Sequence, residues 1–401
     1  MLLSVCLITK NEERFLAGCL DSVRPVAEEI ILVDTGSVDR TVEIAREYGC
    51  RVLHRAWDDD FSAARNAGIA VARGRFILCL DADERVSDPA ALLPAISDAG
   101  LEVGGFFIER HDIVTHPDGE SDVYPIGILR LFRNHPAIRY EGIVHERPNE
   151  TVVRAGFQIG SLSTLKLTHL VNHLSRERLD SKQRGYLRLL DRELEKDSRN
   201  FWARYYRGKT LWYLRRLEEA QEAFRSIVDD QECAVSLRAS AWCMLASLLS
   251  EEGLRGAAVG CIQESLALIP DQSLAFYVLA EILYADGRFA HAHEAYSRVR
   301  RSLDPKSGTS QVPGDLCMTP GKRGYKLGCC SLALGALAEA ESRFREGLQD
   351  DPIHSGCHYG LARVALLRGD ATEALKRLEA ALEHNPAWTA PRELLAQLRD
   401  S

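Results

Sequence analysis

The sequence lacks any long hydrophobic run. No apolar stretch approaches the roughly 20 residues that a helix needs to cross a bilayer. The start of the chain also lacks the basic segment and the small-residue cleavage site of a signal peptide, and it turns polar at Lys10. We therefore expect a cytoplasmic protein with no transmembrane segment. Peripheral attachment at the inner face of a membrane stays open.

An excess of positive charge is also missing. The chain has 58 Asp and Glu residues against 50 Lys and Arg residues, which gives a formal net charge of -8. Because sequence-independent binding of nucleic acid depends on clustered positive charge, this balance argues against a nucleic-acid partner. The 11 cysteines form no Cys-x-x-Cys pair, which disfavours a structural zinc site. We expect reduced thiols in the core.

The N-terminal half alternates short apolar runs with helical patterns. Such runs are typical of parallel strands that are covered by helices on both faces. The expected strands are 3–9, 29–33 and 75–80, the expected helices are 12–23, 39–49 and 61–73, and 104–114 and 124–133 are further strands. This βαβ progression predicts an α/β domain whose ligands bind beyond the carboxyl ends of the parallel strands.

Polar residues follow each of the three expected parallel strands. Residues 9–12 follow the first strand, 34–37 the second and 81–84 the third. The acids in 81–84 repel one another unless a cation or hydrogen-bond donors compensate them. Mg²⁺ or Mn²⁺ would do so, with water and substrate phosphates completing the metal's shell. An ordinary acidic turn is the alternative interpretation.

Four segments resemble, in order and spacing, the motif series of family 2 glycosyltransferases. They are TKNE at 9–12, VDTGSVDRT at 33–41, FSAARNAG at 61–68 and DAD at 81–83. The resemblance covers about residues 1–175. It implies a Rossmann-like GT-A fold, a nucleotide-diphosphate sugar donor, a divalent metal, Mn²⁺ or Mg²⁺, and inversion at the anomeric carbon. Among donors we expect a UDP-sugar.

The resemblance also implies a nucleotide site. By the family's pattern, Thr9 and Asp34 would face the base and ribose, Arg65 would contact the nucleotide, and we place Glu12 in the same set. The residues themselves agree, because a carboxylate at a strand end can accept hydrogen bonds from a base or a ribose. An Asp34 that only opens the following turn is the simpler alternative.

The metal site is expected around the Asp-x-Asp motif. Asp81 and Asp83 would lie near the ribose and the metal by the family's pattern. The short alternating strand 165–169 ends in His169, and a neutral imidazole is a good ligand for Mn²⁺. The family usually continues here with an aromatic residue and glycine, which this sequence lacks. His173 and an ordinary surface role for His169 therefore stay open.

A catalytic base is expected in the segment 139–146, RYEGIVHE. This segment resembles a stretch in the branch of the family that includes lipopolysaccharide-core glucosyltransferases. An inverting transfer needs one group to take the acceptor's proton. We predict Glu146 for this role, with His145 as the alternative. Neighbouring residues on a strand point to opposite faces, so only one of them should face the sugar.

The C-terminal half, from about residue 176, is rich in helical patterns with an internal period. Small and apolar positions recur every 34 residues, as between Leu245 and Leu279 and between Leu327 and Leu361. The small residues let two helices approach, and a proline ends the second helix. These five copies resemble tetratricopeptide repeats and predict an all-α solenoid.

The repeat spacing also predicts the domain organisation. From Leu279 to Leu327 it grows to 48 residues, which indicates an exposed insertion near 303–320, with a loop over a groove as the alternative. The predicted parts are a GT-A domain at 1–175, a linker helix at 176–200, about five repeats at 201–386 and a capping helix at 387–401.

The combination of parts predicts a function. Helical repeats form concave surfaces that hold peptides or partner proteins. A family 2 domain with such a tail resembles bacterial peptide glycosyltransferases that modify cysteine or serine in ribosomally made bacteriocins. We expect an inverting, metal-dependent hexosyltransferase acting on a peptide or protein side chain, with the repeats binding the acceptor or a partner. The alternatives are a transferase for lipopolysaccharide or another cell-surface glycan, and a non-catalytic scaffold with a decayed domain. A homodimer also stays open.

Overall fold

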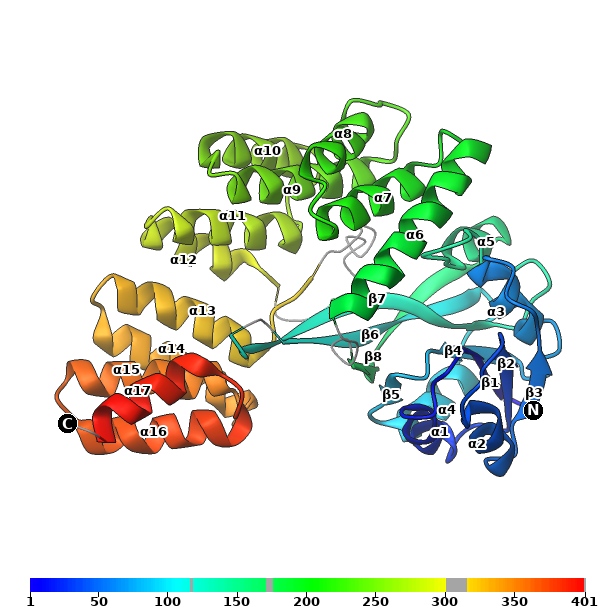
Figure 1. Ribbon diagram of the computed structural model, residues 1–401, viewed down its shortest axis with the longest axis horizontal. Coiled ribbons are helices and arrows are strands. Elements are labelled where there is room, and N and C mark those ends of the chain that lie inside the picture. The colour runs from blue at the N-terminus through cyan, green and yellow to red at the C-terminus, as the bar shows by residue number, and fades with distance from the viewer. Residues whose placement is uncertain (116–117, 171–175, 301–315, 400–401) are drawn as a thin grey trace. The chain divides into compact units, whose positions relative to one another are not determined.

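The computed structural model describes residues 1–115, 118–170, 176–300 and 316–399 (Figure 1). They form two compact units. The first comprises Met1–Asp112 and Gly127–Ala223, and the second comprises Ile113–Ile126 and the described residues from 224 onward. The predicted insertion near 303–320 lies largely outside the described residues.

The first unit is built on a mixed sheet of eight strands in the order β3-β2-β1-β4-β7-β6-β8-β5. The strands are β1 (Leu3–Thr9), β2 (Glu29–Asp34), β3 (Arg51–His54), β4 (Phe76–Leu80), β5 (Glu84–Val86), β6 (Val103–Thr115), β7 (Ser121–Arg133) and β8 (Gln158–Leu170). Strands β1 to β4 are parallel, whereas β4–β7 and β5–β8 are antiparallel pairs. The three predicted parallel strands are confirmed. Strand β3 was not predicted, because its four residues, RVLH, are too few and too polar to form an apolar run.

Apolar side chains of the parallel strands pack on both faces of the sheet. On one face Leu3, Val5 and Leu7 of β1 share a buried cluster with helix α1 (Leu16–Val23). On the other, Cys6 of the same strand shares a cluster with Ile69 of α3 (Phe61–Ile69). This alternation places the strand ends, rather than the strand faces, where a ligand can reach them.

Two long helices after the sheet belong to the first unit as well. They are α6 (Arg176–Lys196) and α7 (Phe201–Tyr213). Leu189 and Leu190 of α6 and Ala203 of α7 form a buried cluster with Val144. The linker helix therefore packs on the predicted base segment. The shorter helices of this unit are α2 (Thr41–Glu47), α4 (Leu92–Ser97) and α5 (Asn149–Arg154).

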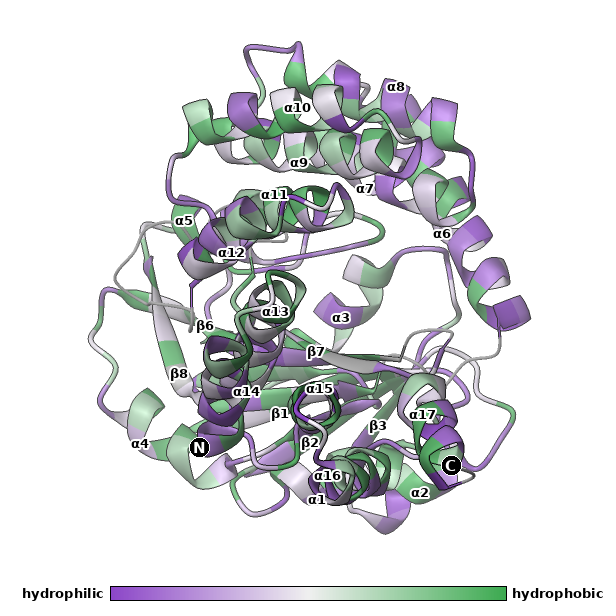
Figure 2. Cartoon of the chain, turned by 90° about the vertical axis from the view of Figure 1, so that its left-hand side faces the viewer, coloured by the Kyte–Doolittle hydropathy of each residue, from purple (hydrophilic) through white to green (hydrophobic). Residues whose placement is uncertain are grey.

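The repeats appear as consecutive helix pairs. The five predicted copies correspond to α7 with α8 (Leu217–Val228), α9 (Val235–Glu251) with α10 (Arg255–Leu268), α11 (Ser273–Ala285) with α12 (Phe289–Arg298), α13 (Pro320–Ala333) with α14 (Leu337–Asp350), and α15 (Ser355–Leu367) with α16 (Ala371–His384). Helix α17 (Thr389–Arg399) follows the last pair. Figure 2 shows hydrophobic and hydrophilic residues mixed along these helices, as expected for helices that bury one face.

Glycines end the first helix of the later pairs. Gly253, Gly287, Gly335 and Gly369 all have positive φ angles, between 73° and 80°. In the first pair Arg215 adopts this left-handed conformation at φ 61° instead. A residue with a Cβ is less suited to this region than glycine, which explains why the first copy is the least regular in sequence.

All 11 cysteines are free, and only Cys261 is not fully buried. Within the described residues, none of the helices combines the length and apolar character needed to span a membrane.

Close helix approach in the fourth and fifth pairs yields a stability prediction. A Cβ added to Gly360 would lie 2.4 Å from the ring of Phe344, whereas one added to Gly256 would meet nothing within 4 Å. We expect Gly360→Ala to lower the free energy of unfolding by about 1–3 kcal/mol. Gly256→Ala, its control, should be neutral or stabilising by up to about 1 kcal/mol. Urea unfolding followed by circular dichroism measures both, and equal stabilities would contradict the packing described.

Candidate active site

The carboxyl ends of β1, β2 and β4 bring the predicted strand-end residues to one edge of the sheet. Thr9 and Asp34 are direct partners in the β1–β2 register, and Asp81 follows the last residue of β4, which pairs with β1. The βαβ prediction therefore placed these residues correctly in the chain's topology. Their roles in binding remain predictions.

Asp34 is held by the turn that follows it. Its carboxylate accepts hydrogen bonds from the backbone N–H of Ser37 at 3.1 Å and of Gly36 at 3.3 Å, and His54 Nδ1 lies 3.4 Å from it. Burial alone would raise the pKa of Asp34, but hydrogen bonds from the Ser37 side chain, from the two backbone N–H groups and from His54 outweigh it and lower that pKa. Beside it, the buried Oγ1 of Thr9 has no hydrogen-bond partner within the described residues. An unused polar group at this edge suits a ligand.

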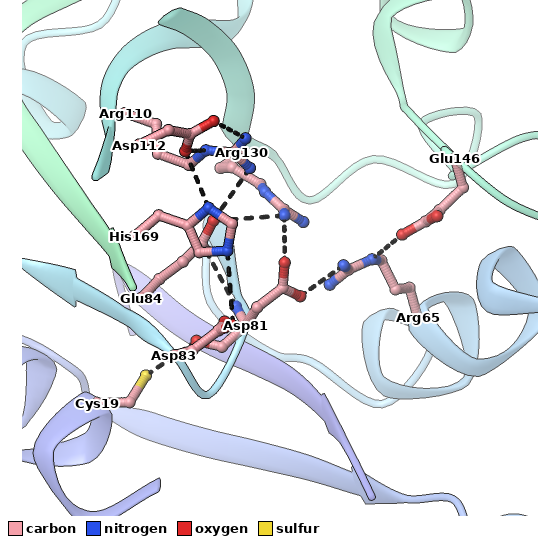
Figure 3. Close-up of polar contacts among 10 residues, drawn as sticks. All are labelled: Cys19, Arg65, Asp81, Asp83, Glu84, Arg110, Asp112, Arg130, Glu146 and His169. Carbon is pink, nitrogen blue, oxygen red and sulfur yellow. Dashed lines mark hydrogen bonds and ion pairs between the residues drawn. The ribbon is translucent and has the colours of Figure 1, made fainter. Parts of the chain in front are cut away.

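Arg65 of α3 joins two of the predicted functional acids. Its Nη2 donates to Asp81 Oδ1 at 2.7 Å and its Nε donates to Glu146 Oε1 at 2.5 Å (Figure 3). Its Nη1 is buried without a partner in the part of the chain that the structure describes. The guanidinium also lies 5.2 Å from the ring centroid of Tyr140. Arg65 is thus fixed in place and keeps one unused donor.

A second arginine completes the surroundings of Asp81. Arg130 of β7 donates from Nη2 to Asp81 Oδ2 at 2.6 Å and lies 3.5 Å from the fully buried Glu84. Burial alone would raise the pKa of Asp81, but Arg130 and Arg65 hold it well below its usual range. Sequence reasoning missed Arg130. The signal was a charged residue between Leu129 and Leu131, inside the otherwise apolar stretch 126–132 of β7.

The network continues to the predicted metal ligands. Arg110 of β6 lies 3.5 Å from Glu84 and donates to Asp112 at 2.7 Å (Figure 3). Asp112 in turn bonds His169 Nδ1 at 2.9 Å, and His169 Nε2 lies 3.5 Å from Asp83. Burial opposes protonation of His169, but Asp112 and Asp83 outweigh it and raise its pKa to about 9. The predicted pair Asp83 and His169 is therefore brought together, while His173 lies outside the described residues.

The candidate ligands fit a divalent cation only in part. Among the described residues, no group of three or more His, Cys, Asp or Glu side chains is suited to hold a metal. Both oxygens of Asp81 are engaged by arginines. The other predicted ligands are Asp83 and His169, whose Nε2 atom lies 3.5 Å from Asp83, and Asp112 orients the imidazole as metal-binding histidines are usually oriented. Two protein ligands suffice where substrate phosphates supply the rest.

Glu12 and Lys182 flank the carboxylates. Burial raises the pKa of Glu12 to about 7, the charges of Asp83 and Asp81 add to this effect, and Lys182 opposes it. Lys182 lies on α6, 5.7 Å from the ring centroid of Tyr186. Sequence reasoning did not connect Lys182 with the site, because nothing in the helical pattern marks which face of α6 meets the sheet.

The predicted base segment is not a strand. It is a turn closed by a bridge between Glu141 and Arg147, and His145 adopts a positive φ of 55°. Glu146 pairs with Arg65, whereas His145 stacks on Tyr206 of α7 with ring centroids 3.9 Å apart. Burial, aided by nearby lysines, lowers the pKa of His145 to about 3. The two residues therefore face different surroundings, although not through strand alternation as predicted.

A mixed sheet with charged residues at the carboxyl ends of its parallel strands, followed by helical repeats, defines an α/β ligand-binding domain joined to a repeat array. Comparison with protein families agrees. Residues 4–152 match the model described as glycosyl transferase family 2, and residues 331–398 match a tetratricopeptide repeat model. The chain therefore carries a family 2 glycosyltransferase domain followed by tetratricopeptide repeats, which confirms the predicted fold class.

Three proteins are similar to parts of this chain. A TPR repeat-containing protein of Synechococcus elongatus is 35% identical over 193 residues, which cover 48% of this chain and 47% of that protein. The SPbeta prophage-derived glycosyltransferase SunS of Bacillus subtilis is 28% identical over 231 residues, 56% of this chain and 52% of SunS. A tetratricopeptide repeat protein from Parabacteroides merdae matches with a TM-score of 0.42 and 14% identity over 56% of this chain and 83% of its own. The chain spans about half the length of the two curated relatives.

The arginine pair around Asp81 yields a second stability prediction. Arg130→Met leaves Asp81 and the buried Glu84 with one arginine each, so we expect a loss of about 3 kcal/mol in the free energy of unfolding. Arg40→Met, which removes an exposed pair with Glu43, is the control and should cause no measurable change. Chemical unfolding of both variants checks this, and an Arg130→Met protein as stable as the control would refute it.

The buried imidazole of His145 predicts a pH dependence. The pKa of His145 is about 3 in the folded chain and about 6.5 in the unfolded chain. Between pH 3 and pH 6.5, therefore, the imidazole is protonated mainly in the unfolded chain. Stability therefore falls as the pH falls below about 6.5, by up to about 1.4 kcal/mol per pH unit. His145→Asn, a residue that tolerates positive φ, should remove this contribution. Parallel pH–stability curves for the native and variant proteins would contradict the burial of His145.

Proposed function

We propose that this chain transfers a sugar, with inversion, from a nucleotide-diphosphate donor to a peptide or protein side chain. The observation that carries the proposal is the group of charged residues at the carboxyl ends of the parallel strands in the family 2 domain. Arg65, Asp81 and Asp83 belong to its charge network, and Asp34 ends the strand next to β1. An exposed acidic turn needs no such network. A buried cluster with unused polar groups at Thr9 and Arg65 suits a bound nucleotide.

Each residue then has a proposed task. Thr9 and Asp34 hold the base and ribose, and Asp81 fixes Arg65 so that the free Nη1 group points to a bound anion. Asp83 and His169 would hold Mn²⁺ or Mg²⁺, which when bound neutralises charge on the diphosphate leaving group. Since a metal ligand must be a neutral imidazole, metal binding requires His169 to lose the proton that it carries here.

Glu146 is the proposed base. Its Oε1 accepts a hydrogen bond from Arg65, and Oε2 accepts none within the described residues, so Oε2 is the oxygen proposed to take the acceptor's proton. His145 is a poorer candidate, because its Nε2 is buried against the aromatic side chains of α6 and α7. The geometry favours Glu146 over His145.

The acceptor is proposed from the domain combination. Tetratricopeptide repeats beside a transferase domain suit a peptide or protein acceptor, and the similarity to the glycosyltransferase SunS supports a shared class of reaction. Nothing in the described residues supports a homodimer, and we propose none. A UDP-sugar is the first donor to test.

Donor turnover tests the proposal. We expect the full chain to release nucleoside diphosphate from one of a panel of UDP- and GDP-sugars with Mn²⁺ or Mg²⁺, and to lose this activity with a chelator. Asp83→Asn should reduce the rate at least about 100-fold. Asp98→Asn is the control. It removes an exposed carboxylate that does not belong to the site, so this variant should retain the rate. If no donor is bound or turned over, the proposal is wrong and the chain is a non-catalytic scaffold.

The acceptor class is tested separately, with the donor found above carrying a labelled sugar. Incubated with a cell extract, the full chain should place the label in protease-sensitive material. Label recovered in lipid-linked or polysaccharide material would instead assign the cell-surface glycan function.

A further inference from the structure

A cavity beside helix α6 carries an unusual set of charges. It has a volume of about 600 Å³ and is lined by two leucines and six charged residues, which are Arg184, Arg188, Asp191, Arg192, Glu195 and Arg216. All of them belong to the first unit, and none belongs to the charge network around Asp81. The cavity is therefore a separate feature of the helices that follow the sheet.

Three of the arginines form a stripe along one helix face. Arg184, Arg188 and Arg192 are four residues apart, so their side chains are neighbours on α6. Like charges at this spacing destabilise a helix. The chain as a whole is acidic, with a net charge of -8, so its composition does not account for the stripe. An anion between the guanidinium groups would remove the repulsion.

Most of the other charges at the cavity already have partners. Asp191 accepts a hydrogen bond from Arg207 at 2.7 Å, and Arg216 donates to Glu219 at 2.6 Å. Arg192 donates to the carbonyl oxygen of Asp59 at 2.7 Å. Its Nε atom is nevertheless buried, with no hydrogen-bond partner in the described part of the chain. Arg192 also lies 3.7 Å from the Asp59 carboxylate, so its guanidinium lines the cavity from a fixed position.

Arg184 and Arg188 are the two arginines at the cavity that form no ion pair with the described residues. Neither forms a hydrogen bond within the described residues either, and both side chains are exposed. Glu195 lies seven residues beyond Arg188, about 10 Å along the helix, so it is poorly placed to neutralise them. The excess positive charge is concentrated at the end of the cavity nearer the start of α6.

We propose that this cavity is a binding site for a compact polyanion that carries phosphate groups. Guanidinium groups bind phosphate through paired N–H donors, which a row of arginines supplies repeatedly. The volume falls in the range of small-ligand sites. Its lining contains no aromatic side chain on which a base or sugar ring could stack, so the phosphate groups are the part that it recognises. The phosphate belongs to a soluble polyphosphate ester or to a lipid headgroup.

Pyrophosphate binding to the full chain tests the site. Calorimetric titration is carried out at constant ionic strength with a chelator present, so that no metal assists binding at the strand edge. We expect saturable binding that weakens at least about tenfold in Arg184→Gln/Arg188→Gln, because charged hydrogen bonds of this kind are each worth about a factor of ten. Arg188→Lys keeps the positive charge but lacks the paired N–H donors of a guanidinium group. This variant should bind pyrophosphate with intermediate strength.

Lys196→Gln is the matched control, because Lys196 is exposed on the same helix but does not line the cavity. Its binding should stay within about twofold of the native protein's. Circular dichroism confirms that each variant is folded. Absence of saturable binding, or equal weakening in Lys196→Gln and in the double variant, would overturn the proposal.

Vesicles distinguish the source of the phosphate. If phosphatidylcholine vesicles containing phosphatidylglycerol sediment the native chain but not the double variant, the ligand is a lipid headgroup. If pyrophosphate binds and vesicles do not, the ligand is a soluble phosphate ester. If the native protein and the double variant bind vesicles equally, the membrane contact does not involve Arg184 and Arg188. That result would count against this cavity as a lipid-headgroup site.

Discussion

The site depends on one interaction, the clamping of Asp81 between Arg65 and Arg130. A carboxylate at the end of a buried strand is costly unless donors replace the water that it has lost. Here α3 and β7 each supply one arginine, and each oxygen of Asp81 accepts one hydrogen bond. The same contacts hold the end of β4 in place against both elements. This carboxylate therefore organises the strand edge.

The two aspartates of the Asp-x-Asp motif have different surroundings. Because both oxygens of Asp81 bind arginines, we propose that Asp83, which lies beside His169, would hold the metal instead. Asp112 holds the far side of the imidazole and is itself paired with Arg110. The alternation of acids and arginines places at least one arginine within 4 Å of Asp81, Glu84 and Asp112. In the proposed function, a cation and a diphosphate would enter a site whose protein groups are already oriented.

The sequence predicted the elements well and the contacts between them poorly. Apolar runs located β1, β2 and β4, and the period of 34 residues located the helix pairs. Both signals are local. The positions of Arg130 and Lys182 depend on which elements meet, and no periodic pattern encodes that. The segment at His145 was misjudged as a strand because its left-handed turn carries no glycine at that residue.

Our central proposal is that Asp83 and His169, and not Asp81, hold the metal, while Asp81 keeps its contacts with Arg65 and Arg130. A crystal structure of the full chain with Mn²⁺ and a nucleoside diphosphate, with the metal located by its anomalous scattering, tests it most directly. The account predicts a metal peak bonded to Asp83, His169 Nε2 and the diphosphate, with both Asp81 contacts to Arg65 and Arg130 intact. A metal bonded to an Asp81 released from the two arginines would contradict it.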